Sequence, residues 1–340
     1  MDDMRATPIP IKWHSELPIF ACEPFLKAVS DEYGWLGGID ESGRLRCILP
    51  YTIIHKAFIK MVRFRIETIL LDGELDVQEE KEFLNNVIEY FRFMRADIII
   101  PGANNAIFRT YPDGADAAPY GSYVVDLSQP EDILWRNVGK IYRQNIGRAQ
   151  RDGVGIRSGI EHFDPAYTLI RDTFRRSKLP FMKYGSFKRY VLGLGENCKI
   201  LVAYYKEIAQ GCTVYAFSKH CAYAVYGGSI EEIHQGAIKL VDWEAIRMFK
   251  QLGVRLFDFV GARINPEKGS KQEAINSYKR RLGGKLKQGY MWKYSLRPLR
   301  SLPYSFAVRF FRGGDIVDAE RHKMKSHGAL AMEESFDKED

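Results

Sequence analysis

The sequence predicts a mixed α/β (α+β) protein in which two units, each with a mixed central sheet, follow one another along the chain. The 340 residues, 46% of them apolar, are more than one core usually organises. Apolar runs with a period of two residues alternate with runs of period 3.6. Residues 1–130 carry 13 Lys and Arg against 20 Asp and Glu, whereas residues 131–312 carry 33 against 15. The basic second unit is therefore expected to bind an anionic partner.

The first unit is predicted to span residues 1–127 and to alternate strands with helices. The segment Asp40-Glu41-Ser42-Gly43 between two apolar-alternating runs predicts a hairpin, because glycine supplies the positive φ that the turn needs. The predicted helices lie near Phe25–Tyr33 and over Val77–Met94, and the predicted strands over Trp35–Ile39, Arg44–Ile53, Glu67–Leu71, Ala96–Pro101 and Gly121–Leu127.

The second unit is predicted to span residues 128–295. It begins with one long helix, for which Ser128 and Glu131 have the spacing of a capping box and Gly153 supplies the stop. Three meander strands followed by helix, strand, helix and strand give the element order of the GNAT acyltransferase fold. The predicted elements after the long helix are Val154–Ile160, Pro165–Arg176, Ser186–Leu194, Lys199–Tyr205, Gly211–Phe217, Ala222–Gly227, Gln235–Leu252, Val254–Gly261, Lys271–Leu282 and Gly289–Ser295.

The remaining features concern the chain's end and its surroundings. Residues 296–312 are basic and aromatic; we expect them to pack back onto the first unit and complete it, with peripheral contact to anionic lipid as the alternative. Residues 313–340 are predicted to be a mobile acidic tail. No apolar run has membrane-spanning length and the start lacks the features of a secretory signal, so a cytoplasmic location is expected. Five unpaired cysteines and scattered histidines predict neither disulfides nor a metal site.

Three segments carry the functional signal: Lys140–Val154 directly after Val124–Leu127, then Tyr226–Ser229, and then Leu256–Ala262 followed by Ser277–Gly284. In type and order they resemble the motifs of the FemAB family of peptidoglycan bridge aminoacyltransferases and of related GNAT-like acyltransferases in polysaccharide pathways. The resemblance implies two tandem GNAT-like domains, an acceptor in a cleft, and a donor reaching the second unit. The chain has no coiled-coil arm, and Tyr278 replaces the family's phenylalanine.

The candidate catalytic residues are Asp258 and Lys279. Asp258 interrupts an apolar strand, and a buried carboxylate needs either a partner or a raised pKa; a purely structural carboxylate is the competing interpretation. The resemblance places a substrate-contacting lysine at Lys279, although a cation in the last turn of a helix is often only solvated. The candidate substrate-binding residues, which come from the matched motifs, are Lys140, Arg143, Tyr226, Gly227, Gly228 and Arg280.

The expected activity is transfer of an activated acyl or aminoacyl group to an amine of a sugar nucleotide, a peptidoglycan-like compound or another cell-envelope precursor, small or lipid-linked. The donor is expected to be acyl-CoA or aminoacyl-tRNA, with no tightly bound cofactor. The missing arm weakens the case for tRNA. The segment His234–Ala237 lacks the usual spacing of a CoA pyrophosphate loop and weakens the case for CoA. The alternative is a non-catalytic protein whose basic second unit binds RNA or an anionic envelope precursor.

Overall fold

The computed structural model describes residues 4–56, 58–71, 75–312 and 314–324. In the first half of the protein, helix α2 begins with a capping box in which Asp76 accepts from the backbone of Glu79. The elements of the first half are strands β1 (Arg5–Ile9), β2 (Glu32–Ile39), β3 (Leu45–Lys56), β4 (Ile59–Phe64), β5 (Ile69–Leu70) and β6 (Ile98–Pro101), with helices α1 (Glu23–Val29) and α2 (Val77–Phe93) and the 3-10 turn η1 (Ile19–Ala21). Strands β1 and β4 were absent from the sequence prediction.

The second half follows the predicted element order closely. Its elements are β7 (Asp116–Asp126), α3 (Glu131–Asn137), α4 (Lys140–Arg151), β8 (Gly155–Ser158), α5 (Phe163–Arg176), α6 (Tyr184–Leu194), β9 (Cys198–Tyr205), β10 (Ile208–Phe217), β11 (Cys221–Ser229), α7 (Ala237–Gln251), β12 (Leu256–Asp258), β13 (Ala262–Arg263), α8 (Lys271–Arg281) and β14 (Lys285–Ser295), with 3-10 turns η2 (Ile160–His162) and η3 (Gly195–Asn197). Helix α9 (Pro298–Arg312) comes last.

The long helix predicted at the start of the second half is wrong: the chain forms two helices, α3 and α4. Val138 and Gly139 take extended backbone angles between them. The predicted capping box is also wrong, because the Ser128 hydroxyl donates to Asp126 (2.7 Å) and the N-cap of α3 is Pro130, which offers no side-chain cap. The predicted stop is confirmed, since Gly153 has a φ of 87°.

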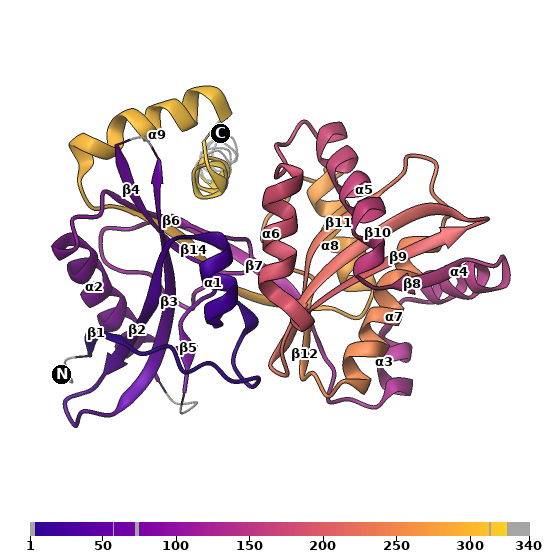
Figure 1. Ribbon diagram of the computed structural model, residues 1–340, viewed down its shortest axis with the longest axis horizontal. Coiled ribbons are helices and arrows are strands. Elements are labelled where there is room, and N and C mark those ends of the chain that lie inside the picture. The colour runs from indigo at the N-terminus through magenta and orange to yellow at the C-terminus, as the bar shows by residue number, and fades with distance from the viewer. Residues whose placement is uncertain (1–3, 57, 72–74, 313, 325–340) are drawn as a thin grey trace, which may run out of the picture.

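The strands join into one mixed sheet rather than two separate ones (Figure 1). Within the described residues the order is β1-β2-β3-β4-β6-β14-β7-β12-β11-β10-β9-β8. Strand β14 links the halves, because Tyr294 and Ser295 pair with β6 while the rest of the strand pairs with β7. Strand β7 pairs with β12 on its other side. Strand β7 thus pairs with strands of the second half, whereas the predicted boundary follows residue 127, and this boundary stays a prediction.

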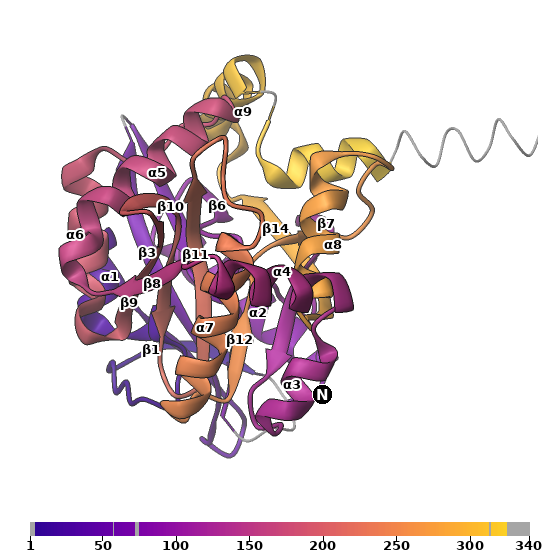
Figure 2. The same ribbon diagram turned by 90° about the vertical axis from the view of Figure 1, so that its right-hand side faces the viewer.

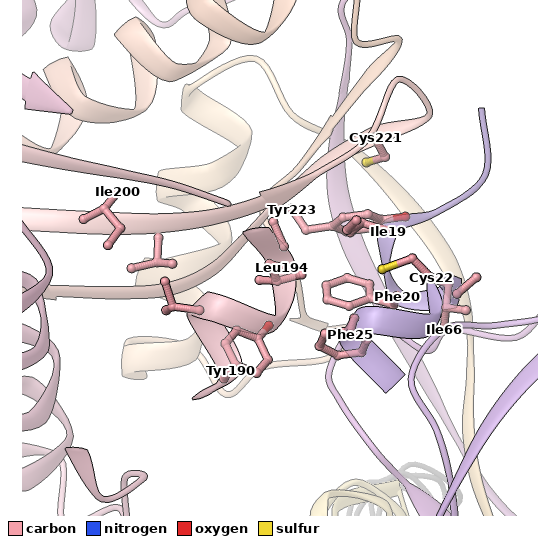
Figure 3. Close-up of a cluster of buried hydrophobic side chains, with 14 of the residues drawn as sticks. Ile19, Phe20, Cys22, Phe25, Ile66, Tyr190, Leu194, Ile200, Cys221 and Tyr223 are labelled. Atoms are coloured by element: carbon pink, nitrogen blue, oxygen red, sulfur yellow. The ribbon is translucent and has the colours of Figure 1, made fainter. Parts of the chain in front are cut away.

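An apolar core fills the junction between the two halves (Figure 3). The ring centroids of Phe20 and Tyr223 lie 4.9 Å apart, and those of Phe25 and Tyr190 lie 5.6 Å apart. Burial of aromatic rings from both halves stabilises their relative position. The labelled contributors are Ile19, Phe20, Cys22, Phe25 and Ile66 from the first half and Tyr190, Leu194, Ile200, Cys221 and Tyr223 from the second.

The C-terminal segment returns to the first half. Helix α9 lies across it (Figures 1 and 2), where Arg297 and Arg300 approach the buried Asp97. The chain after residue 313 was expected to be mobile, but residues 316–324 are helical. Val317 is fully buried in a cluster with Ile107 and other apolar side chains, so the packed part of the chain extends further than predicted. The acidic end, 325–340, lies outside the described residues.

Candidate functional site

The centre of the candidate site is the point where strands β11 and β12 separate. The two strands pair in parallel only from Cys221 to Tyr223. Strand β11 continues to Ser229, whereas β12 ends at Asp258. A gap between two parallel strands exposes backbone groups that would otherwise be paired, which makes such a place suitable for binding a ligand. We call this place the splay.

Directly after β12, Val260 and Gly261 form a turn with positive φ angles of 51° and 75°. A β-branched residue adopts this conformation only at a cost in energy, so the surroundings must hold it there. Asp258 accepts a hydrogen bond from the Val260 amide (2.6 Å). Lys279 donates from Nζ to the carbonyl of Val260 (2.7 Å) and to that of Gly261. The structure thus brings the two predicted catalytic residues together on one strained turn.

Both residues are charged groups in a buried place. Asp258 is 7% exposed, the Ser122 hydroxyl donates to it, and burial raises the pKa of its carboxyl group. Lys279 is 9% exposed, and burial lowers the pKa of its ammonium group to about 8, although the nearby Asp258 and Asp242 carboxylates oppose this. Each therefore has a contact that positions the turn, and a direct role in chemistry stays a prediction.

A cavity of about 180 Å³ opens between the halves beside this turn. Its polar wall includes Arg65, which follows β4, and Asn104; its other wall includes the predicted residue Tyr226 and Val260 itself. The complete lining is Phe20, Phe25, Arg65, Gly102, Ala103, Asn104, Asn105, Tyr190, Val225, Tyr226 and Val260. We call it the Arg65 pocket.

Arg65 is a cation without a carboxylate. Its Nε donates to the Thr52 hydroxyl (3.2 Å) and its Nη1 to the Gly102 carbonyl (3.1 Å), and no acidic oxygen of the described residues lies within salt-bridge distance. Burial lowers the pKa of its guanidinium to about 10, which still leaves it charged at neutral pH. A desolvated cation with donors to spare favours an anion in the pocket.

Asp258 also borders a second junction cavity, of about 310 Å³, together with Cys221 and His220. Across this cavity Lys287 of β14 pairs with Glu67 of the first half (2.7 Å), and this contact bridges the two halves. Burial lowers the pKa of His220, so its neutral form is favoured. Both cavities border the apolar junction core, since Tyr223 lines this one and Phe20 and Phe25 line the Arg65 pocket.

The predicted cations Lys140, Arg143 and Arg280 lie where α4 begins and α8 ends, a junction closed by the Gly139 amide donating to the Arg281 carbonyl (2.8 Å). Arg143 uses Nη1 to donate to the carbonyls of Trp135 (3.3 Å), Arg136 (2.8 Å) and Val138 (2.6 Å), which satisfies the free end of α3. It is thus occupied within the protein, and its role in substrate binding stays a prediction.

Lys140 and Arg280 are exposed. Nearby, the ring of Tyr142 has Lys239 Nζ 5.0 Å and Arg281 Cζ 6.0 Å from its centroid, and it packs against Tyr278. Among the described residues, Lys140, Lys239, Arg280 and Arg281 form no ion pair, so we call them the cationic cluster. Cations next to an aromatic ring, as Lys239 and Arg281 are here, can bind phosphates while the ring stacks on a base or another ring.

The predicted glycines differ in what they do. A Cβ on Gly228 would lie 2.5 Å from the backbone of Leu169 and Ile170, so this glycine lets α5 pack closely against β11. Gly227 is exposed, and a Cβ there would meet only ordinary contacts. Close approach of a ligand to the backbone is thus open at Gly227, whereas the room at Gly228 is taken by a helix.

The start of α7, where a CoA pyrophosphate would be expected, is covered. A Cβ on its N-cap residue Gly236 would lie 2.2 Å from the Asn145 carbonyl of α4. His234 contacts Asp152 with its Nε2 (3.0 Å). The helix end therefore packs against protein.

Two charged residues of this region, one half-buried and one buried, were not among the sequence candidates. Arg65 is the first. The second is Asp242 of α7, 5% exposed, which accepts hydrogen bonds from the hydroxyls of Tyr215 (2.8 Å) and Tyr278 (2.7 Å), with Thr213 at 3.5 Å. This contact explains the tyrosine at 278: its hydroxyl ties α8 to α7. An acidic residue on the apolar face of α7 was the signal available in the sequence.

Comparison with solved structures places the chain in a known fold class. FemX is similar with a TM-score of 0.65 at 11% identity, over 88% of this chain and 99% of that chain. The C-terminal domain of a putative lysylphosphatidylglycerol synthetase from Agrobacterium fabrum has a TM-score of 0.52 at 11% identity, over 84% and 96%. A conserved protein of unknown function from Bacteroides thetaiotaomicron has 0.50 at 10%, over 85% and 99%.

At these identities the similarity shows the fold. It confirms the predicted two-part α/β fold, which this chain shares with FemX. No protein-family model matches the sequence, and no curated protein matches it. Within the described residues, no helix combines the length and the apolarity needed to cross a membrane. In the same part of the chain, no cluster of three or more His, Cys, Asp or Glu side chains is arranged for a metal ion.

Proposed function

We propose that the protein is an N-acyltransferase that moves an activated acyl or aminoacyl group to an amine of an anionic acceptor, such as a sugar nucleotide, a peptidoglycan-like compound or another cell-envelope precursor. One observation carries the proposal: both catalytic candidates hold the strained Val260–Gly261 turn at the splay, next to the uncompensated cation Arg65. The FemAB-like fold supports it.

The reaction needs alignment more than it needs reactive side chains. The amine nitrogen attacks the carbonyl carbon of the donor; a C–N bond forms, the C–S or C–O bond to the leaving group breaks, and the proton lost by the amine ends on the leaving group. Negative charge develops on the carbonyl oxygen in between, so a fixed backbone and a nearby cation lower the barrier.

Each part of the site then has a task. Arg65 binds the anionic part of the acceptor and Tyr226 packs against it in the same pocket. Asp258 and Lys279 fix the turn, and Lys279 adds positive charge behind it. The cationic cluster, where α4, α7 and α8 meet, binds the phosphates of the donor, so donor and acceptor meet at the splay.

Because α4 packs onto the start of α7, that helix end has no room for CoA. This packing favours the other donor class, an aminoacyl-tRNA. Because both acyl-CoA and aminoacyl-tRNA are cytoplasmic compounds, we also propose a cytoplasmic location.

The direct test is to incubate the protein with labelled acyl-CoAs or aminoacyl-tRNAs and a panel of anionic amine acceptors, and to look for labelled amide. We expect transfer that falls at least tenfold in kcat/KM in Arg65→Met. The matched control is Arg157→Met, which removes an exposed arginine paired with Glu207 far from the site. Folded protein that transfers nothing across the panel would refute the proposal.

The cationic cluster also supports a second candidate function, a non-catalytic protein that binds RNA or an anionic envelope precursor. Such binding would weaken steeply with salt, because cations displaced from phosphates are released on association. Tight, salt-sensitive binding of RNA with no product from any donor would favour this second candidate.

A further inference from the structure

Helix α9 has one face fixed to the first half of the protein. Ser301 is 2% exposed and its hydroxyl bonds that of Ser295 (2.6 Å). Tyr304 packs against the apolar side chains at β4 and β6, and Lys56 lies over its ring at 5.7 Å. Arg300 donates to the Phe58 carbonyl (2.9 Å) in the turn between β3 and β4. The helix is therefore a rigid part of the fold.

The opposite face of α9 carries large apolar side chains in water. Leu299 is 88% exposed, Leu302 59%, Phe306 69% and Phe310 73%. Their spacing of three, four and four residues places them on one stripe of the helix. The rings of Phe306 and Phe310 stack at 6.2 Å. Phe58, in the turn that Arg300 contacts, is 59% exposed as well.

Single exposed apolar side chains are ordinary, but a continuous stripe of them indicates a binding surface. The charge of the segment indicates the partner. Residues 297–312 contain four arginines and no acidic residue. An apolar stripe on a basic helix is the pattern of helices that lie in the interface of an anionic bilayer.

The position of the helix agrees with a flat partner. Helix α9 lies along the outside of the first half (Figure 1). A lipid surface offers an apolar layer for the stripe and negative charge for the basic helix.

We propose that the outer face of α9, with Leu299, Leu302, Phe306 and Phe310, docks the protein on an anionic lipid surface. The proposal is independent of the transferase chemistry, because the helix lies outside both junction cavities.

The test is co-sedimentation of the full chain with phosphatidylcholine vesicles and with vesicles containing about 30% phosphatidylglycerol. We expect binding to the anionic vesicles, weakened by salt, and binding to the neutral vesicles at least tenfold weaker. Leu302→Ser/Phe306→Ser should reduce binding about tenfold or more, since two large apolar side chains lose their lipid contact. The matched control is Leu192→Ser on α6, because Leu192 has nearly the exposure of Leu302 (57%) but lies in the second half.

Four results would overturn the proposal. The first is a folded wild-type chain that binds neither kind of vesicle. The second is a dimer in light scattering that Leu302→Ser/Phe306→Ser dissolves, which would make the face an interface between copies. The third is vesicle binding that occurs only after residues 325–340 are removed. In that case the outer face of α9 would be a binding surface for the chain's own acidic end. Equal losses in the α9 variant and in Leu192→Ser would likewise count against it.

Discussion

Asp242 and Arg65 are charged residues near the splay, the first buried and the second half-buried, and their surroundings differ. The Asp242 carboxylate receives hydrogen bonds from the hydroxyls of two tyrosines, with that of a threonine at 3.5 Å, all from the same half. The Arg65 guanidinium has five N–H donors, of which one donates to a hydroxyl and one to a carbonyl, and a cavity lies beside it. A buried charge that is fully satisfied indicates framework, and one with donors left beside a cavity indicates a ligand.

The largest effect should come from removing the satisfied charge. Asp242→Ala takes the acceptor away from three buried hydroxyls, so we expect the free energy of unfolding to fall by about 3 kcal/mol. Denaturant unfolding measures it. Tyr278→Phe, which removes one hydroxyl, is the control and should cost about 1 kcal/mol. If both variants are as stable as the wild type, Asp242 is not framework.

Arg65→Met should affect substrate binding more than stability. Loss of the cation leaves no buried carboxylate unpaired, so stability should change by less than about 1 kcal/mol while KM for an anionic acceptor rises about tenfold to a hundredfold. Steady-state kinetics with anionic and neutral acceptors measure the split. Arg65→Lys should recover part of the affinity. A loss of stability without a change in KM would place Arg65 in the framework with Asp242.

Lys279 shares one property with each of these two residues. Like Asp242, it has hydrogen-bond partners within the protein, and like Arg65 it lies at the candidate site. Its pKa of about 8 in the folded protein is below the usual value for lysine, so its positive charge is lost as the pH rises through about 8. We therefore expect kcat/KM to fall above about pH 8. In Lys279→Arg the fall should move to higher pH, because arginine keeps its charge. An identical profile in both proteins would show that the charge of Lys279 does not support activity.

The lowered pKa of Lys279 also makes the stability of the protein depend on pH. The lysine is less easily protonated when folded, so burying its charge costs stability below about pH 8, and this cost disappears as the pH rises toward the unfolded pKa near 10.4. Wild-type stability relative to Lys279→Met should therefore increase over that window. Unfolding curves of the two proteins at several pH values give the difference, and a constant difference would contradict the assignment.

The smallest effect concerns the strain at Val260. Val260→Gly should stabilise the protein by about 1 kcal/mol or leave it unchanged, since glycine adopts the positive φ freely but gains freedom when unfolded. Gly261→Ala should destabilise it by a similar amount, because a Cβ there meets the Tyr120 hydroxyl at 3.1 Å at a φ of 75°. Thermal melts measure both. If the signs are reversed, the turn is not strained.

Sequence analysis located two of these charged groups, Asp258 and Lys279, and missed the other two, Arg65 and Asp242. Asp258 was found because a carboxylate interrupts an apolar strand, and strand periodicity is a local property. Arg65 was missed because the strand that it follows, β4, was not predicted: arginines at 63 and 65 break the apolar pattern there. Its importance also depends on a cavity formed with residues 160 positions away, such as Tyr226.

The break between α3 and α4 was missed for a similar reason. The apolar stripe runs through both helices, and the side chain that satisfies the open end of α3 is Arg143, which comes from the next helix. Arg143 was a candidate substrate-binding residue, and in the structure it also caps the preceding helix. Periodicity predicts which residues share a face, but the target of a long polar side chain depends on tertiary structure.

Strand β14 has a consequence for how the chain is made. It is the last strand in sequence but lies in the interior of the sheet, between β6 and β7. While a ribosome is still adding residues 285–295, the edges of β6 and β7 have no neighbour on that side. Neither half can therefore complete its sheet before nearly nine-tenths of the chain has been synthesised, and we expect both to finish folding together at that moment.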